Sequence, residues 1–412
     1  MNSEWLPVRK LPKNIQSLSD FFLDSFKSIE YGSLNITFPD GKSIDFVGLK
    51  PGAQVSLKVN DLTFFDDILE RSDIGLAEAY IKRKWECQEI EKLIEFSISN
   101  QKSFIRFFKG NWYKLIYYKL RHKLNANTKK GSKKNIVAHY DLGNDFYSLW
   151  LDSSMTYSSA LWTGLDPNAS LWEAQQNKYK TILQTLGAKP GDRILEIGCG
   201  WGGFLEYAGN LGFHVTGVTI SEEQYKYASE RVQRLGLSEK VKVLKTDYRD
   251  LQGVYDHCVS IEMIEAVGQD YWENYFSKIK SLVKSQGRVT LQAIIMNDQD
   301  FENYRKSTDF IQQYIFPGGM LLAKSQLIKE IHKIEAGHIK FSDFGKDYAR
   351  TLRFWENSFK EKESIIDELG FSEEFKRLWT FYLKYCEGAF LSKKIDVTLC
   401  TFSVNYIEKS SV

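Results

Sequence analysis

The sequence lacks the patterns of a disulfide-rich, zinc-binding, secreted or membrane-spanning protein. Its five cysteines are scattered, with no C-x-x-C pair and no histidine cluster beside them, which argues against disulfides and a metal site. The first residues, Met1-Asn-Ser-Glu-Trp-Leu-Pro, have neither the charged nor the apolar region of a secretory signal. A run of about eighteen apolar residues, which would span a bilayer, is also missing. These absences predict a cytoplasmic protein that binds no metal.

Acidic residues are missing from one long stretch. From Phe96 to Tyr140 there is no Asp or Glu, whereas residues 101–135 hold eleven Lys or Arg and seven aromatic residues. Three interpretations are open: a packed helix with a solvated basic face, an interfacial helix on anionic lipid, or a nucleic-acid site. Aromatic rings at headgroup depth and cations near phosphate favour lipid. The rest of the chain offers no base-reading module, so no nucleic-acid partner is expected.

The chain of 412 residues is long enough for two domains, each with its own core. Residues 31–60 alternate apolar and polar side chains around Asp40-Gly41, which predicts a β-meander with a hairpin. From residue 62 to 99 the apolar period lengthens and indicates two or three helices. We expect an α+β domain over residues 1–100, a basic aromatic helix and linker over 101–135, and a larger domain over 136–412.

Helix and strand patterns alternate in the larger domain. Helices are predicted at 171–187, 204–210, 222–235 and 271–284, and strands at 193–197, 213–219, 240–245, 255–260 and 287–294. This alternation predicts an α/β fold with a doubly wound, mainly parallel sheet. Ligands of such sheets bind beyond the carboxyl ends of the strands.

A glycine-rich motif, Leu195-Glu-Ile-Gly-Cys-Gly-Trp-Gly-Gly203, joins the first of these strands to a helix. Glycine permits a tight turn and brings backbone N–H groups close to a ligand. A turn without any ligand is the alternative. Glu196 at the strand end suits a cationic or hydroxylated ligand, and the next strand, His214–Ser221, ends without the acid that a dinucleotide ribose requires. The motif therefore favours S-adenosylmethionine over NAD.

Further motifs carry a resemblance to a known family. They are His139-Tyr-Asp-Leu-Gly-Asn-Asp-Phe-Tyr, Met155-Thr-Tyr-Ser-Ser-Ala-Leu-Trp162, Val218-Thr-Ile-Ser-Glu-Glu-Gln224, Asp247-Tyr-Arg-Asp, Glu262-Met-Ile-Glu-Ala-Val-Gly268 and Tyr314-Ile-Phe-Pro-Gly-Gly. With the glycine motif, they make residues 135–400 resemble the cyclopropane-fatty-acyl-phospholipid synthases and their mycolic-acid relatives, nearer the plant-like branch. The amino-terminal part resembles, less sharply, the lipid-binding domain of the longer synthases.

The resemblance implies a class I methyltransferase-like sheet and an enzyme that transfers the methyl carbon of S-adenosylmethionine to a cis double bond of an unsaturated phospholipid, forming a cyclopropane. It implies peripheral association with the inner face of the membrane. The implied cofactor contacts are Tyr157, Ser158, Glu196, Gly198, Gly200, Gly202, Thr219, Gln224, Tyr248 and Arg249. A bound bicarbonate is the base in the family, and its pocket maps to Ser159, Glu265, Gln292, Ile294 and Tyr348.

Some of these residues depart from the best-known bacterial pattern. Cys stands there in place of Ser159 and His in place of Gln292, while Ala266 replaces a His that often follows the glutamate. A hydroxyl and an amide still bind an oxyanion. Two alternatives stay open: a related methyltransferase giving a methyl-branched or unsaturated product, and a non-catalytic lipid-binding protein. The oligomeric state is also open, with a homodimer as one option.

Overall fold

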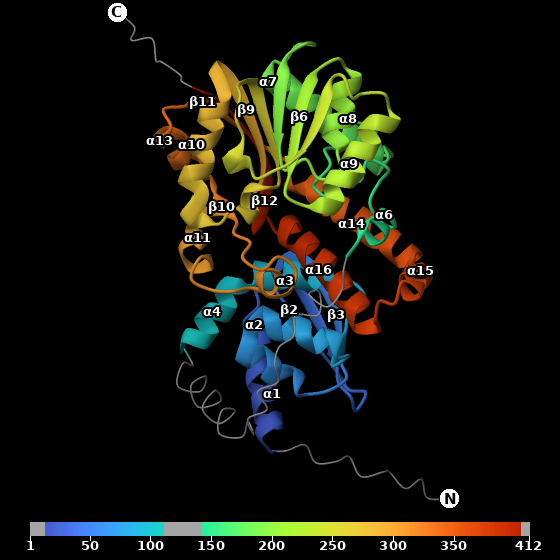
Figure 1. Cartoon of the computed structure of the whole chain (residues 1–412). Helices are drawn as coiled ribbons and strands as arrows, with labels where there is room; N and C mark the ends of the chain where they lie inside the picture. Colours follow the sequence, from blue (N-terminus) through green and yellow to red (C-terminus); the bar gives the residue numbers. More distant parts are fainter. Residues whose placement is uncertain (1–12, 111–141, 405–412) are drawn as a thin grey trace, which may run out of the picture. The chain divides into compact units, whose positions relative to one another are not determined.

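The computed structural model describes residues 13–110 and 142–404 (Figure 1). Their contacts divide the chain into two compact units. The first unit holds the described residues up to 110 together with 313–315 and 370–392, and the second holds 142–312, 316–369 and 393–404. By its contacts the segment 370–392 therefore belongs with the amino-terminal residues, whereas the sequence suggested that it was part of a domain over 136–412.

The first unit contains a four-stranded sheet with the strand order β2-β1-β3-β4. Its strands are β1 (Tyr31–Thr37), β2 (Ser43–Val47), β3 (Lys50–Val59) and β4 (Trp85–Glu86). The hairpin predicted at Asp40-Gly41 is present between β1 and β2. The predicted meander is wrong, because β3 pairs with β1 in the parallel direction. The connection from β2 to β3 passes close to the backbone of Glu30. A Cβ atom at Gly48, in this connection, would lie 2.6 Å from the Glu30 backbone.

The described part of the first unit also contains the helices α1 (Lys13–Phe26), α2 (Phe64–Ile81), α3 (Ile90–Ser99), α4 (Gln101–Gly110) and α16 (Glu373–Leu391). Helix α16, drawn in red beside the blue and cyan helices in Figure 1, packs on α2 and α3. At Gly388 of α16 a Cβ atom would lie 2.5 Å from the Glu91 carbonyl oxygen of α3, so the two helices touch at backbone distance. Arg377 of α16 lies 3.9 Å from the ring centroid of Tyr80 in α2.

Helix α4 is the described part of the basic aromatic segment expected over 101–135; residues 111–135 lie outside the described residues. The ring of Phe104 lies 5.8 Å from that of Phe26, and the ring of Phe107 lies 5.3 Å from that of Phe21. The Lys and Arg side chains of α4 are exposed. Residues 101–110 therefore form a helix that packs through its aromatic side chains and exposes its basic side chains. Contact of this basic face with anionic lipid stays a prediction. No helix among the described residues is long and apolar enough to cross a membrane.

The second unit is built on the sheet order β11-β12-β9-β8-β5-β6-β7. Its strands are β5 (Arg193–Ile197), β6 (His214–Thr219), β7 (Val241–Lys245), β8 (Tyr255–Ile261), β9 (Val283–Met296), β10 (Leu322–Ala323, paired with β9), β11 (Gly337–Asp343) and β12 (Ile395–Ser403). The strands β7, β6, β5, β8 and β9 pair in parallel, and β12 and β11 add two antiparallel pairings. This confirms the predicted doubly wound, mainly parallel sheet.

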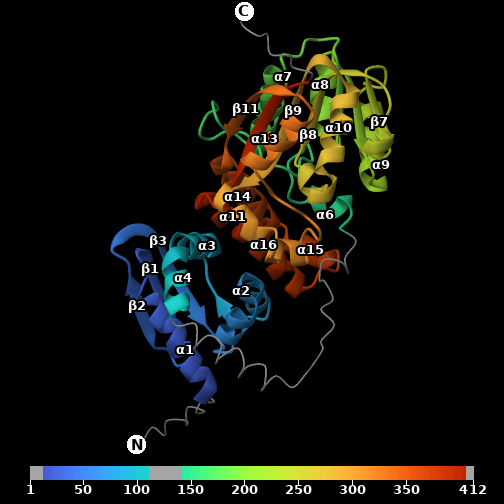
Figure 2. The same ribbon diagram turned by 90° about the vertical axis from the view of Figure 1, so that its left-hand side faces the viewer.

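Helices cover both faces of this sheet, as comparison of Figures 1 and 2 shows. The helices among residues 142–369 are α6 (Asn144–Ser148), α7 (Leu171–Leu186), α8 (Gly203–Asn210), α9 (Glu222–Arg234), α10 (Trp272–Leu282), α11 (Asp298–Tyr304), α12 (Phe310–Tyr314), α13 (Lys324–Lys333), α14 (Gly345–Glu361) and α15 (Glu363–Glu368). Of these, α7, α8, α9, α10, α13 and α14 pack on strands of the sheet. Leu195 and Ile197 of β5 pack in one core with side chains of α10 and α13. Because side chains alternate along a strand, Glu196 between them points to the other face.

The order of the strands reverses beside β5. From β5 the chain runs outward through β6 to β7, then returns to place β8 on the other side of β5. At such a reversal the loops that follow β5 and β8 diverge and leave a crevice at the carboxyl ends of the strands. The loops after β5 and β8 begin at Gly198 and Glu262, so the fold brings two of the sequence motifs to this crevice.

Candidate active site

The glycine-rich turn after β5 forms part of the wall of a cavity. Gly198 and Gly200 have left-handed backbone angles, with φ of +82° and +51°. The N–H groups of Gly198 and Cys199 donate to the Val218 carbonyl at 3.0 and 2.9 Å, which fixes the turn against β6. A Cβ atom on Gly200 would meet nothing within 4 Å. Gly200 therefore borders open space, where a ligand can approach the backbone closely.

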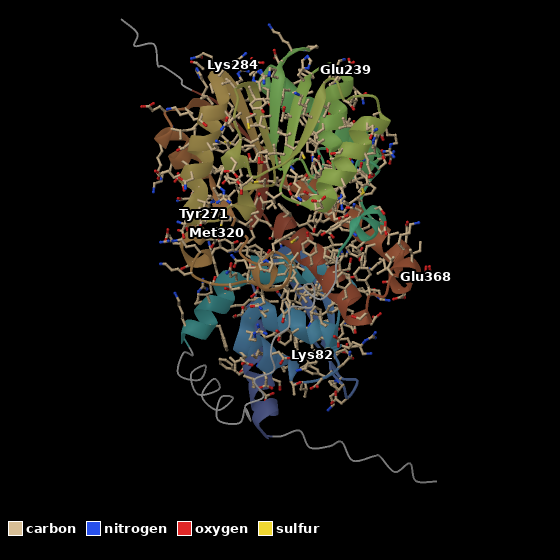
Figure 3. All side chains as sticks on the ribbon, viewed as in Figure 1. Lys82, Glu239, Tyr271, Lys284, Met320 and Glu368 are labelled. Carbon is tan, nitrogen blue, oxygen red and sulfur yellow. The ribbon has the colours of Figure 1, made fainter. Side chains whose placement is uncertain are left out.

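This cavity has a volume of about 620 Å³, within the usual range for cofactor sites. Nine of the ten predicted cofactor contacts line it: Tyr157, Ser158, Glu196, Gly198, Gly200, Thr219, Gln224, Tyr248 and Arg249. Tyr271, labelled in Figure 3, lines it as well. Gly202 does not line the cavity. It precedes α8, and a Cβ atom there would lie 3.2 Å from Ala228, so Gly202 serves the packing of α8 on α9.

Polar side chains follow β6 and β7 at one end of the cavity. Thr219 Oγ1 donates to Gln224 Oε1 at 2.8 Å, which joins the end of β6 to the start of α9. Asp247 Oδ1 accepts from the backbone N–H and from Nε of Arg249, both at 2.9 Å. These hydrogen bonds hold the pKa of Asp247 below its usual value. Tyr248, between them, offers an aromatic face. This end suits a hydroxylated and aromatic ligand part, as a nucleoside has.

A buried lysine contacts the loop that carries Ser158. Lys178 of α7 is fully buried, and its Nζ donates to Ser158 Oγ at 2.7 Å. Gln175, one turn earlier, donates from Nε2 to the Ser158 carbonyl at 3.0 Å. Burial lowers the pKa of Lys178 to about 7, opposed by the charges of Glu262, Asp152 and Glu196. Burial also raises the pKa of Glu196 to about 8, opposed by Lys178. Helix α7 thus fixes the Ser158 loop with a buried cation among carboxylates.

Three of the predicted catalytic residues surround Glu262, the first residue after β8. The Ser159 N–H and Gln292 Nε2 donate to Glu262 Oε1 at 2.9 and 2.7 Å. The Tyr348 hydroxyl donates to Glu262 Oε2 at 2.7 Å. The Ser159 hydroxyl instead donates to the Ala160 carbonyl at 2.9 Å. Residues from β8, β9, α14 and the loop before α7 therefore meet around one carboxylate.

The other two predicted catalytic residues form a separate contact. The Ile294 N–H donates to Glu265 Oε1 at 2.6 Å. Glu265 Oε2 is buried and has no hydrogen-bond partner within the described parts of the chain. Burial, with the Glu262 charge, raises the pKa of Glu265 to about 8. At neutral pH this carboxyl is mostly protonated, so Glu262 and Glu265 form a pair with different proton affinities. Glu265 lies on a 3-10 turn, not at the start of an α-helix.

The pocket expected for bicarbonate is a poor fit to that ion. An oxyanion there would need the Ser159 N–H, the Gln292 amide and the Tyr348 hydroxyl as donors. All three already donate to the Glu262 carboxylate. A second anion beside Glu262 would be repelled by the like charge and would lack these hydrogen bonds. The donors expected for bicarbonate are therefore engaged by a side chain of the protein.

Aromatic rings surround Tyr157, which lines the cavity. The ring centroid of Tyr157 lies 5.3 Å from that of Trp355, 5.4 Å from that of Trp150 and 6.3 Å from that of Phe316. Tyr348 lies 6.1 Å from Trp355. The faces of such rings attract a cation placed over them. The cavity thus offers both carboxylates and aromatic faces near Tyr157.

Sequence reasoning gave no role to Glu262 or Lys178. Glu262 is part of the quoted motif Glu262–Gly268, but its importance follows from donors on three distant segments. Lys178 lies in an ordinary amphipathic helix pattern. The available indication was its place three residues after Gln175, which puts two polar side chains on the face of α7 turned toward the core. Their burial depends on the tertiary fold.

The comparisons with known proteins agree with this geometry. The family model of the mycolic acid cyclopropane synthetases matches residues 127–400. A model of a domain of unknown function (DUF7884) matches residues 21–108. Tuberculostearic acid methyltransferase UfaA1 of Mycobacterium tuberculosis is 36% identical over 331 residues, 79% of this chain and 77% of that protein. Cyclopropane-fatty-acyl-phospholipid synthase of Escherichia coli K12 is 35% identical over 370 residues, 87% of this chain and 90% of that protein.

A solved structure shares the fold of the second unit. The crystal structure of mycolic acid cyclopropane synthase CmaA1, complexed with SAH and CTAB, has a TM-score of 0.59 and 28% identity. The match covers 65% of this chain and 97% of CmaA1. The family, the fold and the glycine-lined cavity together identify an S-adenosylmethionine-dependent C-methyltransferase. The chain belongs to the mycolic acid cyclopropane synthetase family.

Proposed function

We propose that this enzyme transfers the methyl carbon of S-adenosylmethionine to the cis double bond of an unsaturated phospholipid acyl chain and closes a cyclopropane ring. The observation that carries the proposal is the meeting of two features in one cavity: the glycine turn of a methyltransferase and the carboxylate of Glu262. Methyl transfer to an alkene needs both, because the carbocation that results must lose a proton. The synthase of E. coli, similar over most of the chain, is named for this reaction.

The cofactor is assigned to the nine lining residues named above. Bound S-adenosylmethionine supplies an electrophilic methyl group. Thr219 and Gln224 are assigned to the ribose, and Tyr248 and Arg249 to the adenine. Tyr157, Ser158 and Glu196 are assigned to the methionine part, which directs the sulfonium toward the carboxylates. An alkene is a weak nucleophile, so alignment by these contacts is the main contribution to the rate of transfer.

The aromatic rings around Tyr157 have a role in this chemistry. When the alkene takes the methyl carbon, positive charge develops on the acyl chain. The ring centroid of Tyr157 lies 5.3 Å from that of Trp355 and 6.3 Å from that of Phe316. A cation over aromatic faces in a desolvated site is stabilised by about 2 kcal/mol or more. We assign the acyl chain to this aromatic side of the cavity.

The substrate is proposed to be drawn from a membrane surface. The basic aromatic residues after α4 favour contact with anionic lipid at the inner face of the membrane, because each cation near such a surface adds about 1 kcal/mol of binding. Those residues lie at 111–135, beyond the described helix α4. A homodimer stays one option for the assembly.

A second product class has its own support. The relative UfaA1 is named a tuberculostearic acid methyltransferase. Ser159 and Gln292 also stand where the bacterial synthases have Cys and His. Loss of the proton from a neighbouring carbon instead of the transferred methyl group would give an alkene, and its later reduction a methyl branch. Both products need the same methyl transfer and a base.

Mass spectrometry of acyl chains decides between these outcomes. The protein would be produced in a host that makes no cyclopropane lipid, beside the Gly200→Val variant as an inactive control. Acyl chains heavier by one CH2 unit, with ring-specific fragments, would support the cyclopropane. The same mass with a methylene group or a methyl-branched double bond would support the second product class. Acyl chains equal to those of the control would refute lipid methylation.

A further inference from the structure

Glu262 has an unusual backbone for its residue type. Its φ is +48°, in the left-handed region. For a residue with a side chain this conformation costs roughly 1–2 kcal/mol. Such strain persists where surrounding contacts impose it, and it is concentrated at functional sites. Glu262 also lines the cofactor cavity, whereas Glu265 does not. The strained turn after β8 thus places Glu262 in the wall of the cavity.

The hydrogen bonds of Glu262 indicate its charge state and show which acceptor position of its carboxylate stays open. The Ser159 N–H and the Gln292 Nε2 amino group can only donate, and both contact Oε1. A proton on Oε1 would face these donors. The Tyr348 hydroxyl contacts Oε2. An ionised carboxylate accepts about four hydrogen bonds, so three donors leave one position, on Oε2. The arrangement stabilises an ionised carboxylate that keeps one acceptor position open.

The pKa values of the two glutamates follow from their partners. Burial raises the pKa of Glu262, and hydrogen bonds from Tyr348, Ser159 and Gln292 together with the Lys178 charge oppose this rise without cancelling it. Glu265 accepts from the Ile294 N–H alone among the described residues, and burial with the Glu262 charge raises its pKa to about 8. When two carboxyls share a site, the one with more donors keeps its charge. Glu262 is therefore the ionised member at neutral pH.

We propose that Glu262 is the catalytic base of this enzyme and replaces a bound bicarbonate. The inference rests on the proposed function. The π electrons of the alkene form a bond to the methyl carbon while the carbon–sulfur bond breaks and sulfur keeps that electron pair. Glu262 Oε2 then takes a proton from the transferred methyl group. The electron pair of that C–H bond closes the ring onto the cationic carbon, and Glu262 becomes a neutral carboxylic acid.

A carboxylate is a strong enough base for this proton transfer. A C–H bond beside a carbocation is very acidic, so the base must be ionised and well placed rather than strongly basic. The three donors on Glu262 meet both needs, since they hold the charge and fix the carboxylate plane. They also lower its nucleophilicity, which limits ester formation with the cation. Glu265, protonated beside it, keeps the total charge of the pair near minus one.

The first experiment measures turnover on vesicles of unsaturated phospholipid, in buffer freed of carbon dioxide and bicarbonate. We expect the native enzyme to keep its rate, and added bicarbonate to change nothing. Glu262→Gln should lose at least about 100-fold in kcat, the usual scale for a missing acid–base group. Its affinity for S-adenosylmethionine by calorimetry should stay within a few-fold. Glu330→Gln is the matched control and should keep kcat, because Glu330 is likewise a buried glutamate, paired in α13 with the exposed Lys333.

A second variant tests whether the three donors form an oxyanion site. Glu262→Gly relieves the left-handed strain and frees the Ser159, Gln292 and Tyr348 donors. Formate or bicarbonate at millimolar concentration should then restore activity at least tenfold in a saturable manner, and should restore nothing in Glu262→Gln. A rescued variant has folded, so this outcome needs no separate structural test.

Several outcomes would overturn the assignment. A native enzyme that loses its rate without bicarbonate and regains it on addition would make the ion the base. A Glu262→Gln variant within tenfold of the native kcat would show that another group removes the proton. A Glu262→Gly variant that binds S-adenosylmethionine but is not rescued would also contradict it. Absence of any product from the native protein would refute the proposed function, and this inference with it.

Discussion

Gly200 gives the most direct test of the cofactor site. Its φ is +51°, and a Cβ atom there would meet nothing within 4 Å, so the position beside it is open to the cavity. In Gly200→Val three carbon atoms would occupy that space. The branched side chain also carries the left-handed backbone cost of roughly 1–2 kcal/mol. The variant should therefore be somewhat less stable and should bind the cofactor much more weakly.

The two effects can be separated by a matched variant. Gly236, in the loop after α9, has a φ of +68° and likewise nothing within 4 Å of a Cβ atom, but it does not line the cavity. Gly236→Val should lose about the same stability and keep native cofactor affinity. The comparison isolates the part of the Gly200→Val effect that is due to the ligand.

The magnitude follows from linkage. S-adenosylmethionine at about 100 times its Kd stabilises the native protein by about 2.7 kcal/mol. If Gly200→Val weakens binding about 100-fold, the same concentration stabilises the variant by only about 0.4 kcal/mol. Calorimetry gives the affinities, and thermal unfolding with and without cofactor gives the stabilisation. Undiminished affinity in Gly200→Val, or equal losses in both variants, would refute the placement of the cofactor beside this turn.

Three further predictions concern charge. Burial holds the pKa of Glu265 near 8, so the folded protein keeps a proton that this carboxyl releases at lower pH in the unfolded chain, and the free energy of unfolding falls as the pH rises toward 8. Glu265→Gln should flatten this fall between about pH 5 and pH 8, measured by urea unfolding. Lys178→Met should destabilise the protein by roughly 3–5 kcal/mol in the same assay, since it leaves the Glu262 carboxylate without its buried cation and Ser158 Oγ without its donor; a change below about 1 kcal/mol would contradict the buried charge. Flotation should show that binding to anionic vesicles weakens far more than binding to neutral ones when Gln replaces Lys114, Lys119, Arg121 and Lys123; equal binding of both proteins would contradict the proposed contact with lipid.

The sequence predicted the second unit well because its information is local. Periods of apolar residues give the type of each element, and the observed strand β5 (Arg193–Ile197) has the predicted bounds. The order of the strands then follows from the rules for alternating helices and strands. The motifs at the ends of β5, β6 and β8 consequently lie together around one cavity, since parallel strands bring their carboxyl ends to one edge of the sheet.

The errors arose where contacts are distant in the chain. The parallel pairing of β1 with β3 depends on a crossing at Gly48 that leaves no trace in the apolar period. The place of Glu262 depends on donors from Ser159, Gln292 and Tyr348, which the fold collects from three segments. A motif shows which residue types are present, whereas proton affinity depends on what surrounds them.

The position of helix α16 in the sequence affects how the first unit folds during synthesis. Its sheet and helices α1 to α4 end at residue 110, but the helix that packs on α2 and α3 ends at Leu391. At a synthesis rate of about 5–20 residues per second, the ribosome needs roughly 15–60 s to add the residues between them. During that time the surface of α3 around Glu91 and Ile94 has no α16 to cover it. The earliest part of the chain to emerge therefore completes its core among the last.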